Sequence, residues 1–157
     1  FSKNNKITLF NCAMDKEVSK KRLQINKLSM TSSLAEINEK SAYLKLKNFL
    51  TSSKKNFVDE YEVQTNTVDK VFKEMNLNNT LLKIDVEGYE MNVIKGSLEK
   101  LKEIPFILLE NQFGNHYKDN SFKDIENLLL QKNFSITKKF LFPTMHYQDI
   151  LFKKNLN

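Results

Sequence analysis

The sequence predicts an α/β fold in which a mostly parallel sheet is covered by helices on both faces. From residue 60 onward, apolar segments alternate with segments of helical periodicity, in the order strand, helix, strand, helix, strand, helix, strand, strand. Such alternation is typical of a parallel sheet. The last two strands are joined by a short turn, which predicts an antiparallel C-terminal pair. With 157 residues, three glycines and two prolines, the chain (1–157) is expected to form one domain without linkers.

The first 65 residues are predicted to contain three strands and one helix. The segment KITLFNCAM (6–14) has the pattern of a short buried strand, and RLQIN (22–26) alternates like a half-exposed strand. Residues 34–50 carry a loose helical stripe of apolar side chains. YEVQT (61–65) alternates again and predicts a third strand.

The rest of the chain is predicted to supply the main layers of the fold. Thr67 can cap a helix whose apolar stripe includes Val68 and Met75, and Ser121 can cap a later one. The remaining expected elements are a strand over 81–86, a helix over 88–102, a strand over 105–110, and two strands over 134–142 and 146–154.

Charge and composition exclude several functions. The formal net charge is +6, but Arg22 is the only arginine, so we interpret the basic balance as solvated lysine and expect no nucleic-acid partner. Cys12 is the only cysteine and the two histidines lie far apart, which argues against a disulfide and a zinc site. No apolar run approaches the roughly 20 residues of a transmembrane helix and no signal peptide is visible. We therefore expect a cytoplasmic protein without a membrane partner.

Acidic residues lie where two of the predicted parallel strands end. Asp85 ends one strand, Glu87 follows it, and Glu110 ends the next strand along the chain. Right-handed crossovers place such strands side by side, and ligands of parallel sheets bind in the crevice beyond their carboxyl ends. The three carboxylates are therefore expected to face one crevice, with Gly88 allowing a sharp turn or a close ligand approach.

A purely structural explanation of these residues stays open at this point. Asp85 can cap the following helix, while Glu87 and Glu90 complement the positive end of its dipole. Lys83 lies two residues before Asp85 on the same face of the strand, so one salt bridge satisfies both. Glu110 has no such explanation, because no helix begins there.

The segment LLKIDVEGYEMNVIKGSLEKL (81–101) resembles the signature of the FkbM-type methyltransferases. Those enzymes use S-adenosylmethionine on a Rossmann-like fold, so the resemblance implies this fold and this cofactor. ITLFNCAMDKE, YEVQTNTVDKVF, FILLEN and DILFKK resemble other parts of the same family. The signature residues in this chain are Lys83, Ile84, Asp85, Val86, Glu87, Gly88, Glu90, Ile94, Lys95 and Gly96.

The chain departs from that family at one motif. The family begins with an Asp-x-Gly-Ala-Asn-x-Gly type loop, which holds the methionine part of the cofactor, and a following acidic residue takes the ribose hydroxyls. The three glycines here are Gly88, Gly96 and Gly114, all too late for this loop. We therefore expect the family's domain without its first two strand–helix units, a partial methyltransferase domain.

The resemblance and the acidic residues together predict an O-methyltransferase that acts on a hydroxyl of a small sugar or secondary metabolite. An alcohol must lose its proton, and either Glu87 or Glu110 can accept it. Asp85 would orient the substrate or face the cofactor, and Lys83 would hold Asp85 ionised. By analogy with the family, Ala13 and Met14 would border the adenine.

Two other functions fit the same residues. Asp85, Glu87 and Glu110 could bind Mg²⁺ in a phosphoryl-transfer or hydrolase site, although no phosphate-cradling loop is present. Alternatively, the chain is a non-catalytic interaction module that self-associates through an open sheet edge near KITLFN.

Overall fold

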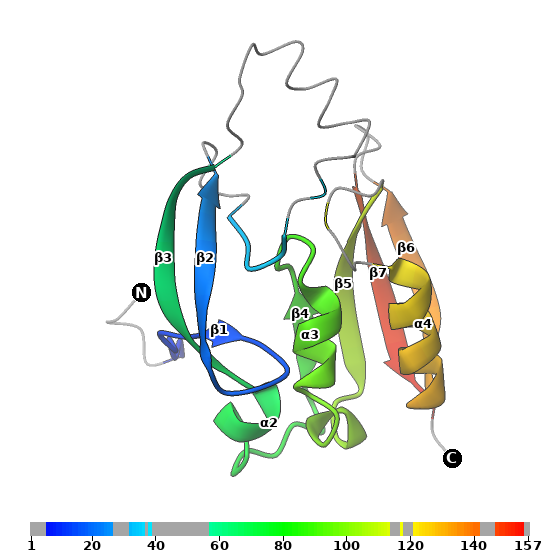
Figure 1. Ribbon diagram of the computed structural model, residues 1–157. Coiled ribbons are helices and arrows are strands. Elements are labelled where there is room, and N and C mark those ends of the chain that lie inside the picture. Colours follow the sequence, from blue (N-terminus) through cyan, green and yellow to red (C-terminus); the bar gives the residue numbers. More distant parts are fainter. Residues whose placement is uncertain are drawn as a thin grey trace.

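The computed structural model describes residues 6–26, 32–36, 38, 57–113, 117, 121–141 and 147–155, which form a mixed α/β structure with two sheets (Figure 1). The first sheet has the order β1-β3-β2 and consists of β1 (Ala13–Met14), β2 (Lys20–Asn26) and β3 (Phe57–Asn66). The second has the order β4-β5-β7-β6 and consists of β4 (Leu81–Ile84), β5 (Phe106–Gln112), β6 (Phe134–Leu141) and β7 (Tyr147–Lys154). The helices are α2 (Val68–Val71), α3 (Glu90–Lys95), α4 (Phe122–Gln131) and the 3₁₀ turn η2 (Lys100–Lys102).

The expectation of one mostly parallel sheet is not confirmed. Among the described strands, β1–β3 and β4–β5 pair in parallel, whereas β2–β3, β5–β7 and β6–β7 pair antiparallel. The expected antiparallel C-terminal pair is present, because the short β6–β7 connection can only reverse the chain. β7 inserts between β5 and β6 rather than adding to the edge, and this placement makes most of the second sheet antiparallel.

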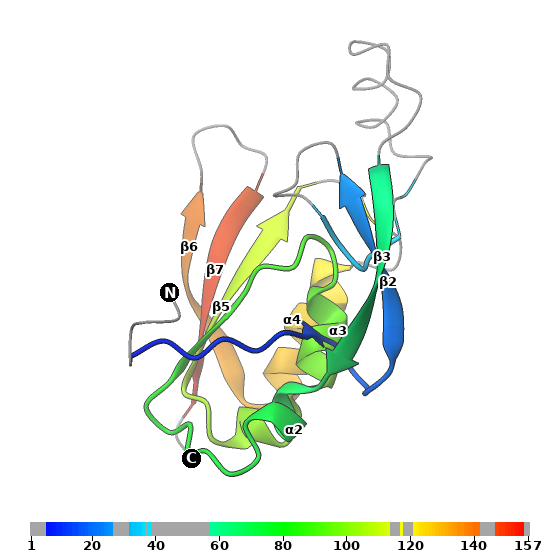
Figure 2. The same cartoon turned by 90° about the vertical axis from the view of Figure 1, so that its left-hand side faces the viewer.

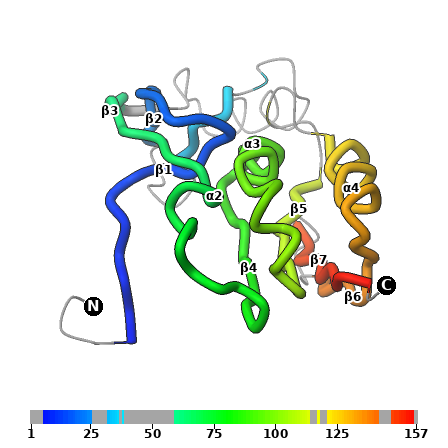
Figure 3. Tube along the Cα trace, turned by 90° about the horizontal axis from the view of Figure 1, so that it is seen from below, coloured from blue at the N-terminus to red at the C-terminus, as the bar shows by residue number. Residues whose placement is uncertain are grey.

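Both long helices lie on the same face of the second sheet. Figures 1 and 3 show α3 and α4 side by side, with α3 over β4 and β5 and α4 over β7 and β6. Leu82 and Ile84 point toward these helices, while Leu81 and Lys83 alternate to the opposite face and are exposed. The core lies between this sheet and the helices, and its fully buried members are Ile84, Ile94, Leu101, Ile104, Ile107, Leu109, Ile125, Leu129, Phe134, Ile150 and Phe152. The described residues therefore do not cover the sheet on both faces as the sequence pattern suggested.

The predicted N-terminal strand is wrong for most of its length. Figure 2 shows the chain before β1 as an extended segment, and only Ala13 and Met14 pair with β3. Leu9 and Phe10 are exposed instead of buried, and Phe10 packs its ring at 5.6 Å from that of Phe72. An apolar alternation needs a neighbouring strand to form a ladder, and the described residues supply one only at the end of this segment.

The two predicted N-caps are confirmed, but the helix boundaries differ from those that the sequence pattern predicts. Thr67 accepts a hydrogen bond from the Lys70 amide and begins α2, and Ser121 accepts one from Asp124 and begins α4. The helix expected over 88–102 is shorter: it is α3, followed by a separate 3₁₀ turn. Most of the helix predicted over 34–50 falls outside the described residues. Among the described helices, none has the length and apolar character needed to cross a membrane.

Candidate active site

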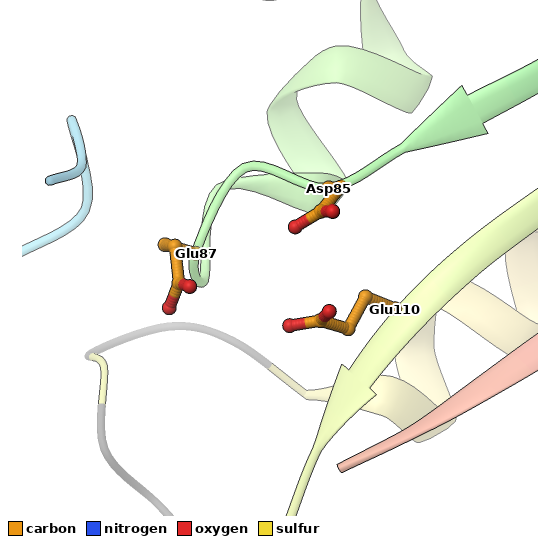
Figure 4. Close-up of side chains that lie close together, drawn as sticks. All are labelled: Asp85, Glu87 and Glu110. Carbon is orange, nitrogen blue, oxygen red and sulfur yellow. The ribbon is translucent and has the colours of Figure 1, made fainter. Parts of the chain in front are cut away.

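Three carboxylates meet beyond the end of β4. One carboxylate oxygen from each of Asp85, Glu87 and Glu110 can be chosen so that all three lie within 4.8 Å of one another, and we call these residues the acidic cluster. Asp85 and Glu87 belong to the loop after β4, whereas Glu110 lies in β5, and the close-up shows their side chains near one another (Figure 4). The parallel register, with Ile84 opposite Leu109, places Asp85 beside Glu110. The prediction that these three carboxylates lie close together is confirmed.

Lys83 forms an ion pair with Asp85 at the edge of the acidic cluster. The two residues are two positions apart, so their side chains point the same way, and those of Lys83 and Asp85 are 48% and 42% exposed. The hydrogen bond to Asp85 raises the pKa of Lys83, so this lysine stays positively charged. Its charge is exposed because the described residues leave this face of the sheet uncovered, which the sequence pattern did not predict.

The loop after β4 does not use Asp85 as a helix cap. Helix α3 begins after Tyr89, which makes no side-chain cap, so the structural explanation of Asp85 as a cap is wrong. Glu90 does serve the turn, because its buried Oε1 accepts a hydrogen bond of 2.9 Å from the Gly88 amide. Burial raises the pKa of Glu90 despite this bond.

The turn itself has an unusual backbone. Glu87 and Gly88 have φ angles of 51° and 88°, a left-handed conformation that is costly for a residue with a side chain. A Cβ at Gly88 would lie 2.2 Å from Cδ2 of Tyr117, so only glycine fits beneath this ring. The Ser33 hydroxyl donates to the carbonyl of Val86 at 3.1 Å and holds the loop from the other side. In this turn conformation the Glu87 carboxylate faces the Gln112 side-chain amide.

Two residues that sequence reasoning missed contact Glu87. The Gln112 amide Nε2 donates to Glu87 Oε2 at 2.5 Å and lies 3.4 Å from Glu110 Oε1. The Tyr117 hydroxyl donates to the same Glu87 oxygen at 3.3 Å. Gln112 could have been found, because it follows Glu110 by two residues on the same face of β5. Tyr117 lies between β5 and α4 in the sequence, where no periodic pattern singles it out.

Glu110 differs from Glu87 in its electrostatic surroundings. Burial raises the pKa of the Glu110 carboxyl, and the charges of Asp85, Glu87 and Asp149 raise it further, partly offset by the hydrogen bond from Gln112. Asp149 lies directly opposite Glu110 on β7, and its Oδ1 is buried without a hydrogen-bond partner among the described residues. Glu110 therefore binds a proton more readily than an ordinary glutamate.

Asp15 and Lys21, from the N-terminal part of the chain, form a second charged network with Tyr89, the residue before α3. The fully buried Asp15 carboxylate is 2.8 Å from Lys21 Nζ and accepts a hydrogen bond of 2.9 Å from the Tyr89 hydroxyl. Lys21 Nζ also donates to the Tyr89 hydroxyl at 2.8 Å. Burial alone would lower the pKa of Lys21, but the bonds with Asp15 and Tyr89 raise it overall. This network ties the start of α3 to the first sheet.

Ala13 and Met14 lie in the first sheet and not in the acidic cluster. Both are half-buried in β1, and Met14 packs against the core. Among the described residues, no hydrogen bond or ion pair joins them to Asp85, Glu87 or Glu110.

The arrangement supports several kinds of chemistry. Clustered carboxylates can accept a proton, attract a positively charged group, or accept hydrogen bonds from substrate hydroxyls. Their spacing also permits the magnesium hypothesis, so geometry alone does not separate it from methyl transfer.

Comparison with known proteins separates these hypotheses. Residues 2–136 match the family described as the Methyltransferase FkbM domain, which covers most of the chain. No significant match was found among curated proteins or among solved structures. A match over this length favours the methyltransferase hypothesis over the phosphoryl-transfer and interaction-module alternatives. The chain therefore belongs to the FkbM methyltransferase domain family, and it is a methyltransferase.

Proposed function

We propose that this methyltransferase uses S-adenosylmethionine to methylate a hydroxyl group on a sugar or secondary metabolite. The observation that carries the proposal is the acidic cluster, in which the Glu110 carboxylate has a raised pKa and lies beside two further carboxylates. A proton acceptor is most effective when its pKa approaches the working pH. An alcohol oxygen is a weak nucleophile until such an acceptor removes its proton, whereas a neutral amine is nucleophilic without losing one.

The residues of the acidic cluster fit the charge of the cofactor. S-adenosylmethionine supplies an electrophilic methyl group on a positively charged sulfur. Asp85, Glu87 and Glu110 bring three carboxylates to one place, with Lys83 as the adjacent cation. Such preorganised charges attract a cation without further rearrangement. The sequence contains no Asp-x-Gly-Ala-Asn-x-Gly loop. The acidic cluster therefore supports the proposal only for the part of the cofactor site that faces the methyl group.

Glu110 is the better general base of the two glutamates. Glu87 Oε2 already accepts hydrogen bonds from Gln112 and Tyr117, which occupy the lone pairs that a substrate proton would need. Glu110 has only the longer contact to Gln112, and burial and neighbouring charges raise its pKa. In the proposed step, the substrate hydroxyl transfers its proton to Glu110 while its oxygen forms a bond to the methyl carbon. The carbon–sulfur bond breaks, and its electron pair stays on sulfur.

The other predicted residues have supporting roles in this proposal. Asp85 faces the positive methyl donor or a substrate hydroxyl, and Lys83 holds its carboxylate in place. Ala13 and Met14 would border the adenine, as the family resemblance implies. The net negative charge of the acidic cluster disfavours anionic acceptors such as phosphate esters, which supports a neutral hydroxyl compound as substrate.

The cofactor part of the proposal is tested by a calorimetric titration with S-adenosylhomocysteine. Binding to a sample with a cooperative unfolding transition is the expected result. A folded sample that binds no S-adenosylhomocysteine would contradict the use of S-adenosylmethionine by this chain. Methyl acceptors are then sought with S-adenosylmethionine carrying a tritiated methyl group and a panel of neutral methyl glycosides.

The role of Glu110 is tested with the variant Glu110→Gln. We expect kcat with the best panel acceptor to fall about 10²- to 10⁴-fold, because the amide cannot accept the proton. Glu74→Gln is the matched control, since Glu74 is exposed and lies outside the acidic cluster. If Glu110→Gln turns over at the control's rate, Glu110 is not the base, and Glu87→Gln is measured next.

A further inference from the structure

The Glu87 carboxylate is held at one of its two oxygens. Gln112 Nε2 and the Tyr117 hydroxyl both donate to Oε2, at 2.5 and 3.3 Å. Two donors on the same oxygen restrict rotation of the carboxyl group and leave Oε1 without either of these bonds. Glu87 is therefore oriented, while Glu110 receives only a contact of 3.4 Å from the same amide.

The backbone provides a second, independent observation. Glu87 has a φ of 51°, a conformation that costs a non-glycine residue free energy and persists only where its surroundings enforce it. Part of that enforcement is the Tyr117 ring, which occupies the space where a Cβ of Gly88 would lie. The same tyrosine therefore shapes the turn with its ring and fixes the Glu87 side chain with its hydroxyl.

We propose that Gln112, together with Tyr117, is a positioning residue of the methyl-transfer site, which sets the distance and orientation between Glu87 and Glu110. This inference rests on the proposed function. Without the Gln112 amide, Glu87 and Glu110 are two like charges with no donor between them, and their repulsion rotates the less restricted carboxylate away. A misplacement of about 1 Å in a methyl-transfer site lowers the rate by up to about 100-fold.

A purely structural role for the Gln112 side chain predicts different results. Gln112 is the last residue of β5 and is half-buried, and the hydrogen bonds of its side chain go to the two glutamates. Gln112→Met keeps the length of the side chain and removes the donor, so it leaves the β5–β7 pairing and the core intact. Gln148→Ala on the neighbouring β7 is the matched control, because it pairs with Asn111 and not with Gln112.

The contact itself is tested by NMR of glutamine side-chain amides, without any substrate. The Gln112 signal is identified by its loss in Gln112→Met, and Glu87→Ala removes the acceptor. We expect the Gln112 amide protons to shift and to exchange faster with water in Glu87→Ala, while the Gln148 signal stays in place. If the Gln112 signal moves no more than that of Gln148, the proposed contact is overturned, whatever the enzyme's activity.

The positioning role is tested by a double-variant cycle with the acceptor that the glycoside panel selects. Gln112→Met should lower kcat about 10- to 100-fold, with the KM for S-adenosylmethionine and the melting temperature unchanged. Tyr117→Phe should lower kcat less, because its bond is longer. Glu87→Ala with Gln112→Met should be no slower than Glu87→Ala alone, since Gln112 acts through Glu87.

Three outcomes would overturn this inference. Losses that multiply in the double variant would show that Gln112 acts independently of Glu87. A lower melting temperature that accounts for the lost turnover would show a structural role. If the wild-type protein transfers no methyl group to any acceptor, the proposed function fails and the positioning role fails with it, and the amide signals still report whether Gln112 contacts Glu87.

Discussion

Two lysine–aspartate pairs of this protein differ in where they lie and in what they do. The Asp15–Lys21 pair has a fully buried carboxylate and connects the first sheet to the turn before α3 through Tyr89. The Lys83–Asp85 pair lies at the acidic cluster with both side chains nearly half exposed. Removing one partner of a buried pair is destabilising because it leaves an uncompensated buried charge, whereas removing one partner of an exposed pair changes stability little. The exposed pair instead leaves its charges accessible to solvent at the acidic cluster.

The largest expected effect concerns the packing beside the buried pair. A Cβ at Gly96 would lie 2.0 Å from the backbone carbonyl oxygen of Asp15, and backbone cannot move aside as a flexible side chain does. Gly96→Ala should therefore lower the free energy of unfolding by about 3 kcal/mol, as measured by urea denaturation. Lys132→Ala, at the C-cap of α4, is the control. Equal stability of the two variants would contradict this close packing.

Breaking the buried pair itself should have the next largest effect. Lys21→Met leaves the Asp15 carboxylate buried without its cation, and should cost about 2 kcal/mol of unfolding free energy. The cost is below that of a fully buried pair because the Lys21 side chain is 30% exposed. Lys20→Met removes the adjacent exposed pair with Glu62 and should leave the free energy of unfolding almost unchanged. If Lys21→Met and Lys20→Met lose the same free energy of unfolding, burial does not determine how much each ion pair matters for stability.

The exposed pair should show the opposite balance between stability and activity. Asp85→Asn removes the partner of Lys83 and should change the free energy of unfolding by less than about 1 kcal/mol, measured by urea denaturation. Methyl transfer should nevertheless fall about tenfold or more, because charge next to the reacting groups is lost. A stability loss as large as that of Lys21→Met would remove the distinction between the two regions.

The smallest expected effect is a pH dependence of stability that comes from Glu110. Its pKa is raised in the folded protein, by burial first and then by the charges of Asp85, Glu87 and Asp149. The folded protein then binds more protons than the unfolded chain between the ordinary glutamate range and the raised pKa, so this group's contribution to stability falls as pH rises through that window. Melting curves should show Glu110→Gln slightly more stable than wild type above the window and equal to it below. A variant that is less stable above the window would mean that the carboxylate is stabilised by its surroundings.

Local features of the fold could be predicted from the sequence because they depend on neighbouring residues. Thr67 and Ser121 begin helices since their hydroxyl oxygens accept backbone N–H groups three residues later. The parallel pairing of β4 with β5 follows from the helix between them, and Lys83 meets Asp85 because residues two apart share a face. These relations also led to the acidic cluster, since Asp85 and Glu110 both lie near the ends of paired strands.

The missed features depend on segments far apart in the sequence. Asp15 and Tyr89 are separated by 74 residues, and no periodicity links a buried aspartate to the residue before a helix. The position of β7 between β5 and β6 likewise depends on which strands pair, and the apolar pattern of a single strand does not specify its partners. It also places Asp149 opposite Glu110, where it adds to the charges that raise the pKa of Glu110.

The sequence by itself determined the order of strands and helices after residue 60, the family and the three carboxylates of the acidic cluster, because these follow from periodicity, caps and one short motif. Only the tertiary structure decided which carboxylate is held by donors and which has a raised pKa, since hydrogen bonding and burial depend on side chains brought from other segments. It also decided that Lys83 is exposed and Asp15 is buried, because each depends on which face of a sheet the rest of the chain covers.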